Sequence, residues 1–250
     1  GDNNILKDIP KSDIIVAGPP CQGFSLTGPR NIDDPRNKLY LSVFKTLKLT
    51  TPKAFVVENV RGLKTMWEGN VFKEIIKKFE SAGYIVTESL LNSADYGVPQ
   101  IRHSVFIVGI KKELDKKFEF PKPEFDKDNY ISCGEAIDNL PSLENGELKT
   151  NDYNEKPTTN YQRYVMDSNK LYNHEATLHK QFVKDTIALV PEGGNYKDLP
   201  KGVGDSRKFN EAWTRYHSKK PSRTIDTGYR NHFHYKWNRV PTIRENARLQ

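Results

Sequence analysis

The sequence contains little cysteine and no long apolar run. Only two of its 250 residues are cysteines, Cys21 and Cys133, too few for a disulfide framework or a four-cysteine zinc site. No stretch reaches the roughly 20 consecutive apolar residues that a membrane helix needs, and the N-terminus lacks the apolar segment of a signal peptide. We therefore expect a soluble intracellular protein in which Cys21 is a free thiol.

Positive charge is concentrated near the C-terminus. The chain has 39 basic and 32 acidic residues, a formal net charge of +7, and residues 201–250 alone carry +8. The same segment contains seven aromatic residues. Basic residues interleaved with aromatic ones suit a phosphate backbone and exposed bases. A solvated basic face over an aromatic core explains the pattern equally well.

Strand and helix signals alternate over the first 110 residues. Apolar runs that predict buried strands occur at residues 13–17, 54–57, 84–91 and 105–110. Apolar residues at helical spacing occur between 39 and 47 and between 71 and 79. This order predicts a parallel sheet with helices on both faces, whose ligands bind at the carboxyl ends of the strands. After residues 111–117 loops and short helices dominate, which indicates a second, smaller lobe.

Two capping boxes predict helix starts in the second half of the chain. Ser132 precedes Glu135 by three residues, and a helix should begin there. Thr242 precedes Glu245 in the same way, but little sequence follows in which a helix could become stable. The strand at 13–17 has the pattern of a central strand without an earlier neighbour. We therefore expect this sequence to be part of a larger fold.

The most chemically distinctive residues follow two of the predicted strands. Cys21 lies in the loop GPPCQGFS (residues 18–25), and Glu58 begins the run ENV (residues 58–60). A cysteine on a loop shaped by proline and glycine is exposed and rigidly aimed, as a nucleophile must be. Parallel strands end at one sheet edge, so both side chains are expected to face one substrate. Taken singly, a buried inert cysteine and a strand-capping glutamate explain them equally well.

These motifs resemble those of the DNA (cytosine-5) methyltransferases. GVPQIR (residues 97–102) is similar to the family's Gln-x-Arg-x-Arg element, and Asn238-Arg239 with RENARLQ (residues 244–250) is similar to its NR…REAARLQ element. Recurrent pieces of the target-recognition region are matched at residues 173–175, 191–195 and 221–225. The resemblance spans nearly the whole chain. It implies an α/β fold, with the Rossmann-like sheet of S-adenosylmethionine-dependent methyltransferases and a smaller, irregular target-recognition domain.

The resemblance also implies a role for individual residues. The Cys21 thiolate would add to carbon 6 of cytosine, which makes carbon 5 able to attack a methyl sulfonium. Glu58 would hold ring nitrogen 3 and the exocyclic amine, and Arg102 would stabilise the substrate side of the pocket. Asp2 and Pro20 would contact the methyl donor, S-adenosylmethionine. The target base would be flipped out of double-stranded DNA.

The DNA contacts that we predict come from both parts of the chain. Asn59 would also shape its own loop, and whether Arg215 and Thr224 contact bases, phosphates or only the fold stays open. We expect a partial catalytic core at residues 1–118, a target-recognition region at 119–238 and a return to the core at 239–250. The expected setting is sequence-specific restriction-modification in a bacterial cytoplasm, or a nucleus, without membrane or metal. The predicted DNA-binding residues are Gln22, Ser25, Asn59, Arg215, Arg223, Thr224, Arg230 and Arg239.

Two features depart from the family pattern. Ser104 stands where the second arginine of Gln-x-Arg-x-Arg is expected, and a neutral serine cannot supply a charge-assisted bond. The sequence also lacks the Phe-x-Gly-x-Gly loop and the last cofactor element of the family. We therefore expect an excised region or a partner chain that carries the missing motifs. The alternative function is a catalytically impaired DNA-binding or regulatory subunit.

Three other enzyme classes fit the sequence poorly. His174 and His179 are five residues apart, so on a helix they diverge by about 140° and do not form a zinc site. A zinc base deaminase needs Pro-Cys-x-x-Cys, and Phe24 occupies the second cysteine position. A cysteine hydrolase needs a histidine beside Cys21, and His103 is the one histidine in the predicted strand-end loops.

Overall fold

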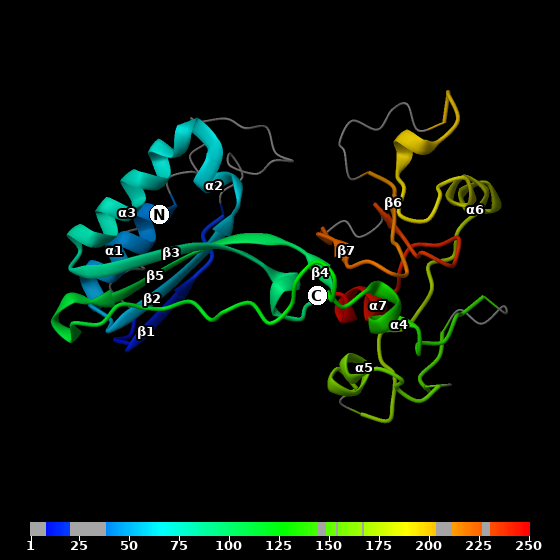
Figure 1. The fold of residues 1–250 in the computed structure, drawn as a ribbon, viewed down its shortest axis with the longest axis horizontal. Coiled ribbons are helices and arrows are strands. Elements are labelled where there is room, and N and C mark those ends of the chain that lie inside the picture. The colour runs from blue at the N-terminus through cyan, green and yellow to red at the C-terminus, as the bar shows by residue number, and fades with distance from the viewer. Residues whose placement is uncertain are drawn as a thin grey trace. The chain divides into compact units, whose positions relative to one another are not determined.

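The computed structural model describes most of the chain in two compact units, each with its own core (Figure 1). The first unit comprises residues 1–92 and 103–122, and the second comprises residues 93–102 and 123–250. The described residues are 9–20, 39–144, 149–153, 155–166, 168–203, 212–226 and 231–250.

The first unit is built around a four-stranded mixed sheet. Its strands lie in the order β1 (Ile14–Ala17), β2 (Ala54–Val60), β5 (His103–Lys111) and β3 (Tyr84–Asn92). β1 pairs parallel to β2, whereas β5 pairs antiparallel to both β2 and β3. The four strands lie where the sequence predicts them, but the prediction of a parallel sheet is wrong for β5. The connection of ten residues between β3 and β5 is too short for a parallel crossover, which needs about a dozen residues or more.

Three helices lie against one face of this sheet: α1 (Tyr40–Thr50), α2 (Gly62–Thr65) and α3 (Asn70–Ser81) (Figure 1). α3 spaces Phe72, Ile75 and Phe79 three or four residues apart, so all three are buried on one side of the helix. The ring of Phe79 packs against that of Phe55, with 4.9 Å between centroids. A Cβ at Gly109 would lie 2.1 Å from the Phe55 ring, so β5 needs a glycine there.

The opposite face of the sheet carries an open apolar strip. Ile14 is 60 % exposed and Val16 is 75 % exposed, both on β1. No described strand pairs with the outer edge of β1. The helices that the structure describes in this unit all pack on the other face, so the predicted helical layer is present on one side of the sheet.

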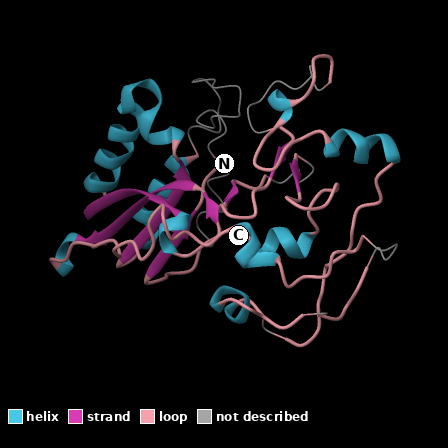
Figure 2. Ribbon diagram, turned by 45° about the vertical axis from the view of Figure 1, so that its right-hand side comes forward, coloured by secondary structure: helices cyan, strands magenta, loops and turns pink. Residues whose placement is uncertain are grey.

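The second unit consists of short elements and long connections (Figure 2). Its strands form two parallel pairs, β4 (Gln100–Ile101) with β7 (Ser222–Arg223) and β6 (Thr214–Arg215) with β8 (His232–Phe233). Because these strands are short, side-chain hydrogen bonds and buried charged groups hold many of the connections in place. In the described part of the chain, no helix has the length and apolar character to cross a bilayer. The helices of this unit are α4 (Cys133–Ile137), α5 (Asn160–Tyr164), α6 (Gln181–Ala188) and α7 (Ile243–Arg248).

Both predicted capping boxes are present in this unit. The hydroxyl of Ser132 accepts a hydrogen bond from the backbone N–H of Glu135 at the start of α4, and Thr242 does the same for Glu245 at α7. α7 packs well despite its length, because Arg248 next to its end is only 2 % exposed. The unit also includes residues 93–102 and 239–250, which the sequence assigns to the catalytic part. The functional names given to the predicted ranges stay predictions.

Candidate active site

The carboxyl ends of β1 and β2 lie side by side. Ala17 pairs with Val57 in a parallel register, so Gly18 and Glu58 are the next residues along the two strands. A Cβ added to Gly18 would lie 3.9 Å from Oε2 of Glu58. The half-buried Glu58 carboxylate therefore lies beside the backbone that leads to Cys21.

Asn59 ties this backbone to β2. It is 5 % exposed, and its Nδ2 donates a hydrogen bond to the carbonyl oxygen of Pro19 at 3.1 Å. Its Oδ1 accepts one from the backbone N–H of Val60 at 2.9 Å. Both polar atoms of the amide are therefore used by the backbone, as expected of a residue that shapes its loop. A direct contact between Asn59 and DNA has no support in this geometry.

Five of the predicted site residues lie outside the described residues: Cys21, Asp2, Gln22, Ser25 and Arg230. Their roles stay predictions. Pro20 is described, and it is exposed directly after the carboxyl end of β1.

Arg102 belongs to the second unit, where its side chain is exposed. Its carbonyl oxygen accepts hydrogen bonds from the backbone N–H and the hydroxyl of Ser93, at 2.9 and 3.3 Å. Two residues earlier, Gln100 is 1 % exposed and donates from Nε2 to the carbonyl oxygen of Leu249 at 3.1 Å. The sequence places Gln100 in the same motif as Arg102 but does not reveal this anchoring role.

Ser104, which replaces the second arginine of the motif, lies in β5 of the first unit and is 8 % exposed. It pairs with Val60, and Phe106 pairs with Glu58. Because side chains alternate along a strand, Ser104 and Glu58 point to the same face of the sheet. The serine therefore adds no positive charge on the face that carries the carboxylate.

Arg215 is buried, and the prediction that it contacts DNA stays a prediction. Its side chain is 8 % exposed, and Nε donates to the carbonyl oxygens of His234 and Tyr235 at 3.1 and 3.2 Å. Nη2 donates to Oδ1 of Asn238 at 2.7 Å, and Nη1 donates to two further carbonyl oxygens. Burial lowers the pKa of this guanidinium. All of its nitrogen atoms hold connections of the second unit.

Arg239 is also buried, at 3 % exposure, and its predicted DNA contact stays a prediction. Its Nη1 and Nη2 donate to the two carboxylate oxygens of Glu245 at 2.8 and 2.7 Å. Burial raises the pKa of Glu245, but the charges of His234 and Arg239 and the hydrogen bonds from Arg239 outweigh it and hold the pKa at about 2. This ion pair fixes α7 within the second unit.

Arg223 and Thr224 are exposed at the end of β7. The hydroxyl of Thr224 donates to the carbonyl oxygen of Ile101 at 3.1 Å, and that of Ser222 donates to Pro99 at 3.1 Å. The side chains of this strand therefore hold the segment that leads to Arg102.

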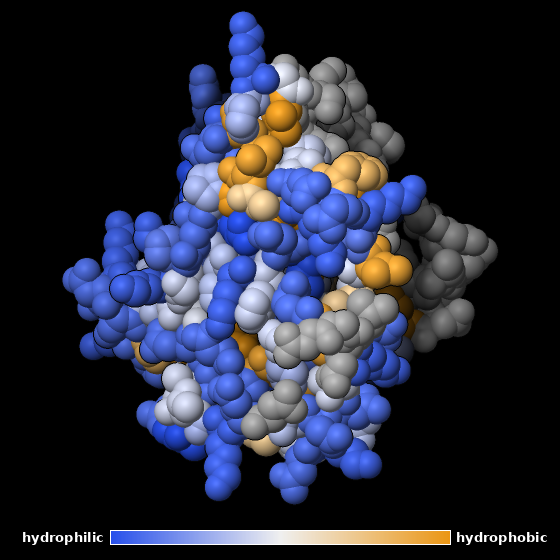
Figure 3. All heavy atoms as spheres, turned by 90° about the vertical axis from the view of Figure 1, so that its right-hand side faces the viewer, coloured by the Kyte–Doolittle hydropathy of each residue, from blue (hydrophilic) through white to orange (hydrophobic). Residues whose placement is uncertain are grey.

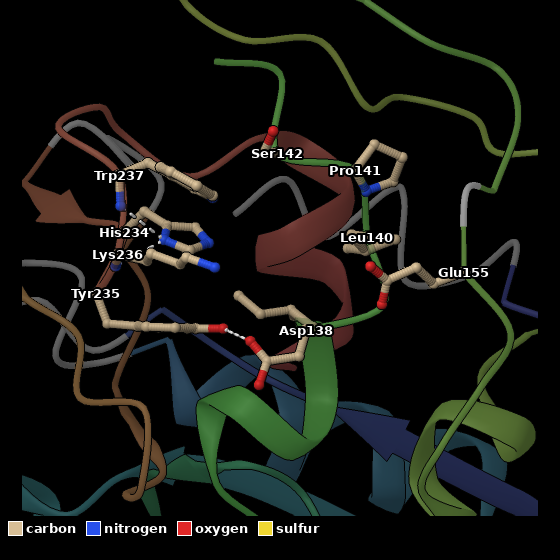
Figure 4. A pocket seen from close by; sticks show the side chains of 10 residues that line it. Asp138, Leu140, Pro141, Ser142, Glu155, His234, Tyr235, Lys236 and Trp237 are labelled. Carbon is tan, nitrogen blue, oxygen red and sulfur yellow. Dashed lines mark hydrogen bonds between the residues drawn. The ribbon is translucent and has the colours of Figure 1, made fainter. Parts of the chain in front are cut away.

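A pocket of about 290 Å³ lies in the second unit, and Figure 4 shows the side chains around it. Its lining comes mainly from the end of α4 and from residues 234–237. The hydroxyl of Tyr235 donates to Asp138, and Nζ of Lys236 lies 4.7 Å from the centroid of the Trp237 ring. No predicted site residue lines this pocket. The described residues also contain no group of three or more histidine, cysteine or acidic side chains placed to bind a metal.

A family model described as C-5 cytosine-specific DNA methylase matches residues 1–250. The chain belongs to this family. The resemblance seen in the motifs is therefore confirmed over the whole sequence. The mixed sheet of the first unit is the Rossmann-like sheet of the S-adenosylmethionine-dependent methyltransferases.

Similar proteins include two Type II methyltransferases. M1.HphI of Haemophilus parahaemolyticus is 37 % identical, with 100 % of this chain and 62 % of that protein aligned. M.DdeI of Desulfomicrobium norvegicum is 36 % identical over 95 % of this chain and 62 % of its own length. A solved structure of a prophage-encoded E. coli protein, described as a DNA modification methyltransferase, has a TM-score of 0.71 at 23 % identity and shares the fold. It covers 98 % of this chain and 70 % of that one. The chain thus spans less than two thirds of the length of M1.HphI and of M.DdeI.

Proposed function

We propose that this chain acts in a Type II modification enzyme that transfers a methyl group from S-adenosylmethionine to carbon 5 of a flipped cytosine in double-stranded DNA. One observation carries the proposal. At the carboxyl ends of β1 and β2, the Glu58 carboxylate lies beside Gly18, whose backbone leads to Cys21, and Asn59 holds that backbone through Pro19. Family membership and the Type II relatives support the same function.

Carbon 5 of cytosine is a weak nucleophile, so the ring must first be activated. The Cys21 thiolate forms a bond to carbon 6, and the electron pair of the 5,6 double bond becomes available at carbon 5. The Glu58 carboxyl group holds the protonated ring nitrogen 3 and the exocyclic amine, which lowers the cost of the charge that thiolate addition creates. When bound, S-adenosylmethionine would supply the methyl group to carbon 5 and leave as the neutral thioether. The proton on carbon 5 is then lost to water, the bond to sulfur breaks, and the thiolate is regenerated.

S-adenosylmethionine is the methyl donor that the family implies. Pro20 lies at the sheet edge where ligands of such folds bind, which suits the sulfonium end of the donor. Asp2, the other predicted contact, lies outside the described residues. One proline is too little to hold the molecule, so Pro20 alone does not define its binding site.

The exposed residues of the second unit are the proposed DNA face. Arg223 is exposed on β7, and residues 201–250 carry a net charge of +8. The surface in Figure 3 is largely hydrophilic, with its apolar areas in separate patches. Protein–DNA interfaces are polar and positively charged, so the basic excess of residues 201–250 suits the role. The buried Arg215 and Arg239 would act only by holding the framework of that surface.

The open side of β1 favours a second candidate, a DNA-binding or regulatory subunit that needs a partner chain. Ile14 and Val16 are exposed apolar residues on a strand whose outer edge has no described neighbour. Further chain in the relatives accounts for more than a third of their length. A complementing polypeptide that covers this side of the sheet would explain both facts.

Trapping with 5-fluorocytosine separates the two candidates. Fluorine at carbon 5 cannot leave as a proton does, so a methylating enzyme remains covalently bound to the DNA. The chain is mixed with duplexes containing 5-fluorocytosine and S-adenosylmethionine, with and without a complementing fragment, and the adduct is mapped by mass spectrometry. We expect an adduct at Cys21. DNA binding without an adduct under every condition would leave only the regulatory role.

The two cysteines provide a matched control. Cys21→Ser should abolish the adduct and spare DNA affinity. Cys133 is fully buried in α4, and burial raises the pKa of its thiol, so it is not a nucleophile. Cys133→Ala should therefore still form the adduct. If Cys21→Ser loses DNA affinity as well, the substitution has disrupted the loop and does not report on chemistry.

A further inference from the structure

The strand pair β4–β7 joins two segments that lie 120 residues apart in the sequence. β4 leads directly into Arg102, and β7 carries the exposed Arg223 and leads into Thr224. In the parallel register, Ile101 pairs with Arg223. Arg102 and Thr224 are therefore the next residues along the two paired strands.

Both peptide groups that flank Arg102 are anchored by hydrogen bonds. On one side, the hydroxyl of Thr224 donates to the carbonyl oxygen of Ile101 at 3.1 Å. On the other side, Ser93 donates to the carbonyl oxygen of Arg102 from its backbone N–H at 2.9 Å. Because the backbone dihedrals of a residue are set by its two flanking peptide groups, these bonds limit where the Arg102 side chain can begin.

The rest of the strand pair is held by buried bonds. Ser222 is 1 % exposed and donates to the carbonyl oxygen of Pro99 from both its N–H and its hydroxyl, at 2.9 and 3.1 Å. Gln100, also 1 % exposed, donates to Leu249. Thr224 is exposed by contrast. Thr224 therefore lies at the exposed end of the strand pair, the end at which Arg102 is also exposed.

We propose that Thr224 is a positioning residue for Arg102, and that its hydroxyl acts through the Ile101 carbonyl rather than on DNA. The proposal rests on the function proposed above and on the role that the family resemblance implies for Arg102, which is to stabilise the substrate side of the pocket. It also implies that the segment containing β7, which belongs to the proposed DNA face, fixes the backbone position of Arg102 through the hydrogen bond from Thr224 to Ile101.

Valine and serine at position 224 test the proposal. Thr224→Val keeps the branched shape and removes the donor, whereas Thr224→Ser keeps the donor. The control is Thr186→Val on α6, where the hydroxyl bonds only within the helix, to Phe182 at 2.8 Å. Circular dichroism verifies folding of each variant, and Thr224→Ala serves as a second deletion of the hydroxyl.

The first readout is hydrogen exchange at the Ser93 amide, which bonds to Arg102 in the full chain. We expect exchange to become roughly threefold to tenfold faster in Thr224→Val, the range expected for loss of one hydrogen bond. Thr224→Ser and Thr186→Val should match the parent chain. Unchanged exchange in both Thr224→Val and Thr224→Ala would overturn the proposal, and this readout does not depend on catalysis.

The second readout separates DNA affinity from reaction. We expect Thr224→Val to slow covalent capture of 5-fluorocytosine in the preformed complex by roughly threefold to tenfold, with the Kd for DNA unchanged. A weaker Kd with an unchanged capture rate would show that Thr224 contacts DNA directly, and would overturn the proposal. If the parent chain captures nothing, the proposed function fails, while hydrogen exchange still decides the role of Thr224.

Discussion

Neighbouring residues at the candidate site divide two tasks between them. Glu58 keeps its carboxylate on one face of the sheet, beside Gly18, where it can contact a base. Asn59 points to the other face, and its side-chain amide forms hydrogen bonds with the backbone of Pro19 and Val60. The alternation of side chains along a strand separates the two roles. The ENV motif identified both residues as important, but the hydrogen bond that explains Asn59 joins residues 40 positions apart.

Replacement of Glu58 should affect chemistry far more than stability. Glu58→Gln keeps the size of the side chain and removes the acid that holds ring nitrogen 3. We expect the single-turnover rate of methylation to fall by about a hundredfold or more, as for other losses of acid–base support. The midpoint of urea unfolding should stay close to that of the parent chain. A rate within a factor of three of the parent would argue that Glu58 does not contact the base.

The buried His234 predicts loss of stability in mild acid. Burial lowers the pKa of His234 from 6.5 to about 4. Between pH 6.5 and pH 4, the His234 imidazole is therefore protonated in the unfolded chain but not in the folded chain. The free energy of unfolding falls as the pH drops through this interval. We expect a loss of about 2 to 3 kcal/mol in the free energy of unfolding between pH 7 and pH 4.5, measured by urea denaturation.

A glutamine variant isolates this contribution. His234→Gln cannot titrate, so its free energy of unfolding should change less over the same pH interval. Glu245, with its pKa at about 2, contributes stability above pH 4.5 that is lost as the pH falls toward 2, so its effect lies lower. An identical pH profile for the parent chain and His234→Gln would contradict the prediction.

Among the elements, α7 shows how a short helix gains stability from its surroundings. Thr242 caps its first turn, Glu245 forms the buried ion pair with Arg239, and Arg248 donates to Oδ1 of Asn139 at 2.6 Å. The Thr242 hydroxyl also lies 2.9 Å from Nδ1 of the buried His174. Isolated helices of this length are unstable in water. The sequence predicted the start of the helix, whereas the buried partners that stabilise it are distant in the sequence.

Removal of the cap should destabilise this element measurably. Thr242→Val deletes the hydroxyl that serves both the helix and His174. We expect the free energy of unfolding to fall by about 1 to 3 kcal/mol, since a cap is worth about 1 kcal/mol and a buried partner is left unsatisfied. Thr242→Ser keeps the hydroxyl and should lose less than half as much. Equal losses for the two variants would indicate that packing of the methyl group, and not capping, is the main contribution of Thr242.

At the scale of the whole molecule, the charge distribution and the two units have separate consequences. The positive excess of residues 201–250 supports attraction to DNA wherever its exposed members lie.

The partition of the chain puts Glu58 in the first unit and Arg102 in the second. The loop between β3 and β5 belongs to the second unit because its strand β4 pairs with β7.

DNA affinity should therefore depend steeply on salt. Each phosphate contact releases about one counterion, so four such contacts would lower the affinity by roughly a hundredfold between 50 and 200 mM salt. Fluorescence anisotropy with a duplex at several salt concentrations measures this slope. Arg223→Ala should reduce the slope by about one. A flat salt response would count against the basic segment as the DNA face.

The family, the four strands, both capping boxes and the two strand-end motifs were predictable from the sequence, because each depends on the order or spacing of nearby residues. The direction of β5, the burial of Arg215 and Arg239, and the attachment of the Arg102 segment to β7 became known from the folded structure alone. Those features depend on which distant groups meet. A basic residue in a basic segment looks the same in the sequence whether its guanidinium is in solvent or pairs with a buried carboxylate, and only the surroundings distinguish the two.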